Sequence, residues 1–207
     1  RNHPCESLWL DIDHMDDFRT FTWKKESFPD PTRMISDMQE QGFHIIPVIN
    51  PGIKTDRAYF VYQQGLAHGY LCRKQGGDLY MGTAWPNDCN FADFSRTAVR
   101  KWWGDLFQQF LAQGIAGSWN DMNEPAQATM IEKKYHKPVL KTFDDDVMHI
   151  ADGENITGPD GPPILHTFFH NAYGMQMARA MREGTQRFAP DKRPFVLTRS
   201  GTAGVQR

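Results

Sequence analysis

Four short apolar segments alternate along this 207-residue chain with longer segments of helical periodicity, and this alternation limits the fold more than any other feature. The apolar segments do not show the strict alternation of a strand that has one face in water. Such segments are typical of strands buried on both faces, as in a parallel sheet covered by helices. The predicted strands cover residues 7–12, 44–49, 115–120 and 195–198.

Three amphipathic segments between these strands are predicted to be helices. Asp30 can cap the first, and Ser95 can cap a second that stops at Gly114. The third covers residues 167–188. Their apolar residues recur at helical spacing, which indicates core packing rather than a cofactor site.

Polar residues follow the end of every predicted strand, and two long insertions, 51–94 and 122–165, do the same. The polar residues are Asp11, Asp13, Asn50, Asp121, Glu124 and Arg199. In a (β/α)8 barrel the loops after the strands build the active site, whereas the loops before them only close the fold. We therefore predict an α/β fold in which the chain forms about half of one catalytic barrel domain. A doubly wound sheet is the alternative, but no glycine-rich nucleotide fingerprint follows any predicted strand.

This fold makes a specific prediction about geometry. The four strands should lie parallel and adjacent in chain order, with Asp11, Asn50, Asp121 and Arg199 on one rim. Because four strands are half a barrel, we expect the chain to be a central piece of a larger domain. Open sheet edges and uncovered apolar faces should then make residues 1–207 poorly soluble on their own.

Composition excludes several classes of function. The net charge is −2 with no basic stripe, so nothing indicates a nucleic-acid partner, and no apolar segment is long enough to span a membrane. Cys5, Cys72 and Cys89 are odd in number and lack CxxC spacing, which favours incidental thiols over a disulfide framework or metal site. A glycosylation sequon at Asn155 has meaning only in a secreted protein, so the compartment stays open.

Residues 119–125 (WNDMNEP) are the most informative motif. Two carboxylates, Asp121 and Glu124, stand three residues apart beside a tryptophan and two amides. A carboxylate can attack a sugar carbon, amides suit hydroxyls, and an aromatic face suits a sugar ring. The alternative is a strand-to-loop corner in which the polar side chains satisfy the turn backbone. The first interpretation is favoured because the neighbouring strands end in polar residues too.

At these residues the sequence resembles glycoside hydrolase family 31, the α-glucosidase family. The resemblance covers nearly the whole chain and consists of many motifs in collinear order. They are residues 9–16 (WLDIDHMD), 21–23 (FTW), 28–31 (FPDP), 50–54 (NPGIK), 85–86 (WP), 93–94 (DF), 102–103 (WW), 119–125, 170–174 (HNAYG) and 193–200 (RPFVLTRS).

The resemblance implies a retaining, exo-acting hydrolase of terminal α-linked glucose that needs no cofactor and no metal. Asp121 would be the nucleophile that forms a covalent glycosyl-enzyme, and Glu124 would orient and polarise the site. Asp11 would bind sugar hydroxyls, and Arg199 would grip a hydroxyl and hold the negative field around Asp121. A loop cap is the alternative role for Asp11, and an ordinary salt bridge for Arg199. The remaining substrate-binding residues would be Asn50, Trp85, Trp119 and Met122.

Two departures from the family pattern bear on specificity. Asn50 stands where the family usually has Asp, and Ala128 stands where an aromatic residue is common. The general acid/base of the family follows the segment that begins here at Arg199, and the chain ends at Arg207 before reaching it. The resemblance therefore implies a fragment that carries a nucleophile without its proton donor, inactive in isolation.

Other functions stay open at this stage. An α-xylosidase, an α-glucosyltransferase and a glucan lyase share this chemistry, and a non-catalytic carbohydrate-binding relative is an alternative of a different class. A metal-dependent hydrolase is a further alternative, because Asp11, Asp13 and Asp121 could ligate a hard cation.

Overall fold

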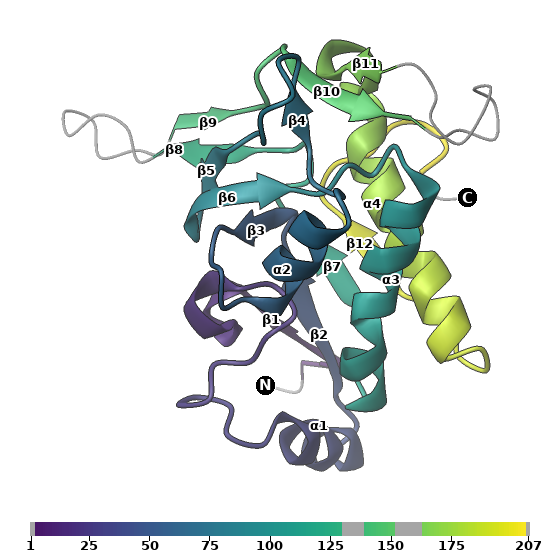
Figure 1. The fold of residues 1–207 in the computed structure, drawn as a ribbon. Helices are drawn as coiled ribbons and strands as arrows, with labels where there is room; N and C mark the ends of the chain where they lie inside the picture. The colour runs from purple at the N-terminus through teal and green to yellow at the C-terminus, as the bar shows by residue number, and fades with distance from the viewer. Residues whose placement is uncertain (1–2, 130–138, 152–162, 206–207) are drawn as a thin grey trace.

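The computed structural model describes residues 3–129, 139–151 and 163–205 and contains a parallel sheet of four strands (Figure 1). The strands β1 (Ser7–Leu10), β2 (His44–Ile49), β7 (Ser118–Asn120) and β12 (Val196–Thr198) pair in this order. Every pairing is parallel. The prediction of four parallel strands, adjacent in chain order, is therefore confirmed.

Three of the strands end or begin at different residues than expected, although β12 differs only by beginning at Val196 instead of residue 195. The first strand stops at Leu10 instead of residue 12, because the Asp11 carboxylate accepts a hydrogen bond from the Ile12 amide and starts a short 3-10 helix, Ile12–His14. The third strand begins at Ser118 instead of residue 115, since the Ala116 amide donates to the carbonyl of Ile45 outside the regular ladder.

The main helices are α1 (Pro31–Glu40), α2 (Phe60–Ala67), α3 (Thr97–Ala112) and α4 (His166–Phe188). The Asp30 cap is confirmed, since its carboxylate accepts a hydrogen bond from the Arg33 amide at 2.9 Å. The Ser95 cap is wrong: Arg96 stands at the N-cap, and the Ser95 hydroxyl donates instead to Asp93 at 2.7 Å.

Helices α3 and α4 lie side by side on one side of the sheet (Figure 1). A Cβ added at Gly104 would stand 2.6 Å from the carbonyl oxygen of Ala180 and 3.1 Å from the Cα of Gly184. No other residue type permits this approach of the two backbones without a shift.

Both insertions form small antiparallel sheets beyond the carboxyl ends of the parallel strands (Figure 1). The first contains β3 (Gly52–Lys54), β4 (Arg73–Lys74), β5 (Gly82–Ala84) and β6 (Asn87–Phe91). The second contains β8 (Gln127–Thr129), β9 (Val139–Lys141), β10 (Val147–Ile150) and β11 (Pro163–Leu165). Strand β4 pairs with β10, so the two insertions share one of these small sheets.

The two faces of the parallel sheet differ in burial. One face carries residues such as Ile45 and Ile49, which join the main core with Trp103, Phe107 and Tyr173 from the helices. The opposite face carries Trp9, Trp119, Phe195 and Leu197. Of these, Trp9, Phe195 and Leu197 are 42%, 43% and 46% exposed. The strand alternation therefore separates a covered face from a partly open one.

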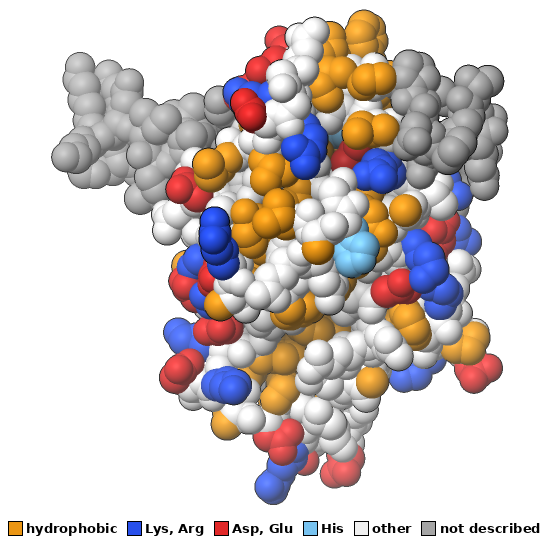
Figure 2. Space-filling view, viewed as in Figure 1, with side chains coloured by type: hydrophobic (Ala, Val, Ile, Leu, Met, Phe, Trp, Pro, Cys, Tyr) orange, Lys and Arg blue, Asp and Glu red, His pale blue; other side chains and the backbone are white. Residues whose placement is uncertain are grey.

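The described residues show where surface charges and cysteines lie. On the face in Figure 2, apolar side chains occupy the middle and charges of both signs lie mostly near the margins. Cys5 is exposed, Cys72 and Cys89 are buried, and all three are free thiols. Among the described residues, no helix is both long and apolar enough to cross a membrane. Asn155 lies outside the described residues.

Candidate active site

The carboxyl ends of the four parallel strands place Asp11, Asn50, Asp121 and Arg199 on one rim of the sheet. Backbone hydrogen bonds continue the ladder up to this rim. The Asp121 amide donates to the Ile49 carbonyl at 3.3 Å, and the Arg199 amide donates to the Asn120 carbonyl at 2.9 Å. The prediction of a shared rim is confirmed, and Asp121 and Arg199 lie at the same end of the sheet.

Arg199 bridges the two carboxylates of the WNDMNEP motif. Its terminal nitrogen lies 3.2 Å from Asp121 Oδ1, and its Nε lies 2.8 Å from Glu124 Oε1. The same terminal nitrogen lies 3.0 Å from Met122 Sδ. The side chains of Asp121 and Glu124 are 15% and 28% exposed, so the pair is partly shielded from water.

The charge of this arginine is secured by its partners. Burial alone would lower the pKa of the Arg199 guanidinium, but the hydrogen bond to Asp121 and the charge of Glu124 raise the pKa above its ordinary value. Arg199 therefore stays a fixed cation between two carboxylates. Two alternatives were expected for Arg199, an ordinary salt bridge and a role in the site. Both involve the same contacts with Asp121 and Glu124.

The loop between these carboxylates has a constrained backbone. Met122 adopts a φ of 58°, in the left-handed region that side chains seldom occupy. Asn123 is fully buried, and its amide bonds to Thr198, Ser200 and Gly174 within the protein. The sequence suggested that the amides of this motif suit sugar hydroxyls, and for Asn123 this is wrong because internal partners occupy it.

Several buried polar atoms at the rim have no hydrogen-bond partner among the described residues. They are Asn50 Oδ1, Trp119 Nε1, Glu124 Oε2 and both amide atoms of Asn120. Asn50 is 7% exposed and Asn120 is fully buried. Unpaired buried polar atoms are costly, so those of Asn50 and Glu124, which follow strand ends, mark a place where a polar ligand would bind.

The remaining predicted site residues fall into two groups. Trp85 packs against the buried Met122 and Ala126, so two expected pocket residues are in contact. The ring of Trp119 instead meets Trp9 edge-on, with centroids 6.3 Å apart. The exposed carboxylate of Asp11 caps the short helix after β1, and its loop-cap role is therefore present.

Potential metal ligands gather elsewhere. Within the described part of the chain, the grouping whose ligand atoms lie within 4.8 Å of one another is Cys72, Asp93 and His149, and it includes none of Asp11, Asp13 and Asp121. His149 Nδ1 lies 2.8 Å from Asp93 Oδ1, and Asp93 also accepts from Ser95 and the Ile150 amide. These donors already satisfy the carboxylate, so the cluster needs no metal to be stable.

A row of histidines extends from this cluster towards the surface. His149 Nε2 lies 2.9 Å from His166 Nδ1, and His166 Nε2 lies 3.1 Å from His170 Nδ1. Burial, together with the charges of the two neighbouring histidines, lowers the pKa of His166 to about 3. Burial would raise the pKa of Asp93, but its bonds to His149, Ser95 and Ile150 hold it below the ordinary value. Sequence reasoning did not find this row, which joins His149 of β10 to His166 and His170 of α4.

The class that this fold and site define is a (β/α)-barrel enzyme with paired carboxylates at the carboxyl ends of its strands. The domain family described as the glycosyl hydrolases family 31 TIM-barrel domain matches residues 1–207. The chain therefore belongs to glycoside hydrolase family 31, and both the resemblance and the barrel fold expected from the sequence are confirmed.

Characterised relatives agree with this assignment. Alpha-glucosidase 2 of Bacillus thermoamyloliquefaciens is 38% identical over 99% of this chain and 24% of its own length. A family 31 α-glucosidase from Bacteroides thetaiotaomicron is 38% identical with a TM-score of 0.73, over 99% of this chain and 30% of that structure. A GH31 dextranase of Flavobacterium johnsoniae, in complex with isomaltotriose, is 27% identical with a TM-score of 0.79, over 99% of this chain and 23% of that structure. The chain thus spans about a quarter of the length of these relatives.

Proposed function

We propose that this chain supplies the nucleophile side of a retaining, exo-acting α-glucosidase. The observation that carries the proposal is the bridge from Arg199 to Asp121 and Glu124 at the carboxyl rim of the parallel sheet. A carboxylate held by an arginine and partly shielded from water keeps its negative charge and a fixed direction. Both properties are needed for attack on an oxocarbenium-like carbon.

In the proposed reaction, an oxygen of Asp121 forms a bond to the anomeric carbon while the glycosidic bond breaks. The bonding electrons pass to the leaving oxygen, which takes a proton from an acid on the opposite side of the sugar. Water then attacks the anomeric carbon, gives its proton to the conjugate base of that acid and releases Asp121 as a carboxylate. Two displacements at one carbon retain the α configuration.

Glu124 cannot easily be the acid, because it lies on the same loop as Asp121 and shares Arg199 with it. We propose that Glu124 holds Arg199 in place and keeps the local field negative as positive charge develops on the sugar. We assign no residue of this chain to the acid. The chain by itself would therefore lack part of the catalytic apparatus.

Substrate binding would use the polar atoms of the rim that have no protein partner. Asn50 Oδ1 and Trp119 Nε1 are buried and unpaired, so sugar hydroxyls would satisfy them. Asp11 would bind hydroxyls through the carboxylate oxygen that does not cap the short helix. Trp85 and Met122 would form an apolar wall beside the sugar ring. Relatives described as α-glucosidases and as a dextranase support an α-glucoside as the substrate class.

The experiment is to replace Asp121→Asn in the full-length parent enzyme and measure turnover of an aryl α-glucoside. Turnover should fall by several orders of magnitude, where a 10⁶-fold loss is about 8 kcal/mol, while substrate affinity should change far less. Asp37→Asn is the matched control, since Asp37 lies on α1 and pairs with Arg33 at 3.8 Å. Near-normal turnover of Asp121→Asn would favour a different mechanism, and a parent that binds α-glucosides without turnover would favour a carbohydrate-binding relative.

A further inference from the structure

Asn123 lies between the two carboxylates that Arg199 bridges, and its contacts mirror those of the arginine. Arg199 binds Asp121 and Glu124, which stand on either side of Asn123 in the sequence. Asn123 binds Thr198 and Ser200, which stand on either side of Arg199. The loops after β7 and β12 are thus interlocked by two reciprocal sets of contacts.

The hydrogen bonds of Asn123 require an amide in one orientation. Its Oδ1 accepts from the Ser200 amide at 3.1 Å, and its Nδ2 donates to Thr198 Oγ1 at 2.7 Å. The Thr198 hydroxyl donates in turn to the Ser200 carbonyl at 2.8 Å, so it must accept from Asn123. An aspartate could keep the first bond but could not donate the second.

Helix α4 also contacts Asn123. Its Nδ2 lies 3.4 Å from the carbonyl oxygen of Gly174 on α4. A Cβ added at Gly174 would stand 2.7 Å from the Asn123 carbonyl oxygen and 2.8 Å from that of Ser200. The helix backbone therefore touches both loops at once and leaves Asn123 fully buried.

We infer that Asn123 is a positioning residue, which fixes the backbone around Arg199 so that the guanidinium meets both Asp121 and Glu124. The inference rests on the proposed function of Asp121. Asn123 is fully buried and bonds within the protein, so its effect on the reaction passes through Arg199. Misplacing a catalytic group by about 1 Å can cost roughly 10²-fold in rate, which sets the scale of the effect.

The test is a double-mutant cycle in the full-length parent enzyme. Asn123→Ala should lower kcat on an aryl α-glucoside by about 10²-fold with little change in KM. In an Arg199→Met background the same substitution should have almost no further effect, because the group through which it acts is gone. Loss of stability alone would lower activity equally in both backgrounds, so the cycle separates positioning from folding.

Matched variants complete the design. Asn90 is also buried, accepts from the Thr55 hydroxyl and donates to the Tyr80 carbonyl, so Asn90→Ala should lower the unfolding temperature but leave kcat within about twofold. If Asn123→Ala does not fold, Thr198→Val removes the same contact, and Thr198→Ser should restore most of the lost rate by returning the hydroxyl. Equal loss of kcat from Asn123→Ala in both backgrounds, or from Thr198→Val and Thr198→Ser, would overturn the inference. Normal turnover of Arg199→Met would instead overturn the proposed site, and with it the inference.

Discussion

Replacing Arg199 by lysine separates the charge of this residue from its geometry. The guanidinium reaches Asp121 at 3.2 Å and Glu124 at 2.8 Å through two different nitrogens. A single ammonium keeps the positive charge, but it cannot reproduce the planar fork that serves both partners. Arg199→Lys should therefore lose one of the two charge-assisted contacts.

The size of the effect follows from that loss. A hydrogen bond to a charged group contributes about 1.5–3 kcal/mol, which corresponds to roughly 10- to 150-fold in rate. The Arg199 side chain is 37% exposed, so solvent screening moves the expectation towards the lower end. We expect kcat to fall by about 10- to 30-fold.

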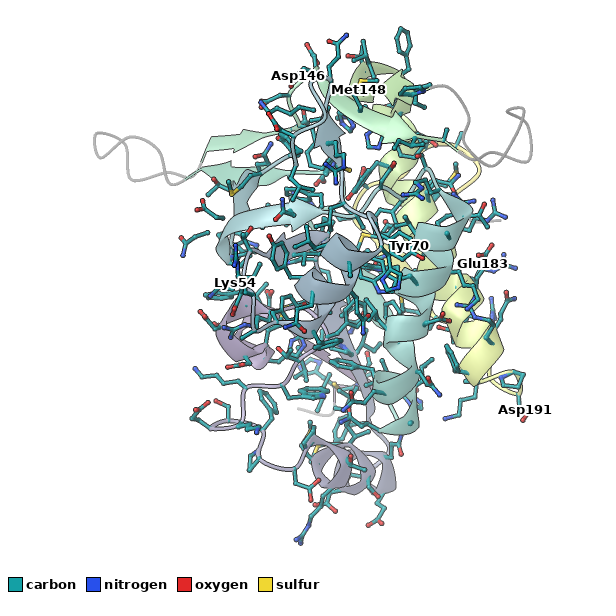
Figure 3. The ribbon with its side chains drawn as sticks, in the orientation of Figure 1. Lys54, Tyr70, Asp146, Met148, Glu183 and Asp191 are labelled. Carbon is teal, nitrogen blue, oxygen red and sulfur yellow. The ribbon has the colours of Figure 1, made fainter. Side chains whose placement is uncertain are left out.

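The assay is steady-state hydrolysis of an aryl α-glucoside by the full-length parent enzyme. The matched control is Arg179→Lys, because Arg179 pairs with Glu183 at 2.7 Å on α4. Glu183 lies on the outer side of the molecule (Figure 3). A kcat within twofold of the wild type for Arg199→Lys, or an equal loss for Arg179→Lys, would refute the reasoning.

Three further predictions concern α4, pH and the isolated chain. Gly174→Ala should lower the unfolding free energy by about 1–3 kcal/mol through overpacking, and a gain of about 1 kcal/mol in helix propensity should partly offset this loss. The same substitution should lower kcat. Unchanged kcat and stability would contradict the close contact. Between pH 6.5 and about 3 the unfolded chain binds a proton at His166 that the native state does not. The unfolding free energy should therefore decrease as the pH is lowered through this window, by up to about 1.4 kcal/mol per pH unit. Unfolding free energies from denaturant titrations at several pH values should depend less steeply on pH for His166→Phe than for His68→Gln, an exposed control. Equal dependence on pH in the two variants would contradict the prediction. Residues 1–207 alone should not measurably hydrolyse maltose if, as proposed, no residue of this chain is the acid that speeds leaving-group departure by about 10²–10⁴-fold. Activity equal to that of the parent would show that the acid lies in this chain.

Much of the parallel sheet could be predicted because its signals are local. Apolar runs such as 44–49 form β2 as expected, and a polar residue after each strand reaches the shared rim. Asp30 caps α1 through a bond to a residue three positions away, which a local pattern can express. For these elements the partner is close in sequence, and the prediction and the structure agree.

The errors arise where distant partners compete for a side chain. Ser95 is a residue type that often caps helices, but its hydroxyl donates to Asp93 instead. Asp93 is fixed by a hydrogen bond with His149, which is more than 50 residues away in the sequence. Asn123 looked like a group for sugar hydroxyls, yet residues 198 and 200 take both ends of its amide. The pairing of β4 with β10 has the same non-local character. Local sequence patterns do not show which of two available hydrogen-bond partners a side chain will bind.

The role of Asp121 as nucleophile can be measured by trapping the glycosyl-enzyme. The full-length parent would be treated with a fluorinated α-glucosyl fluoride that forms the covalent intermediate faster than water releases it, digested, and analysed by mass spectrometry. The proposed mechanism predicts one added sugar on the peptide that contains Asp121, with fragmentation placing it on that carboxylate. A label on Glu124 or on another residue, or rapid turnover with inverted product and no label, would contradict it.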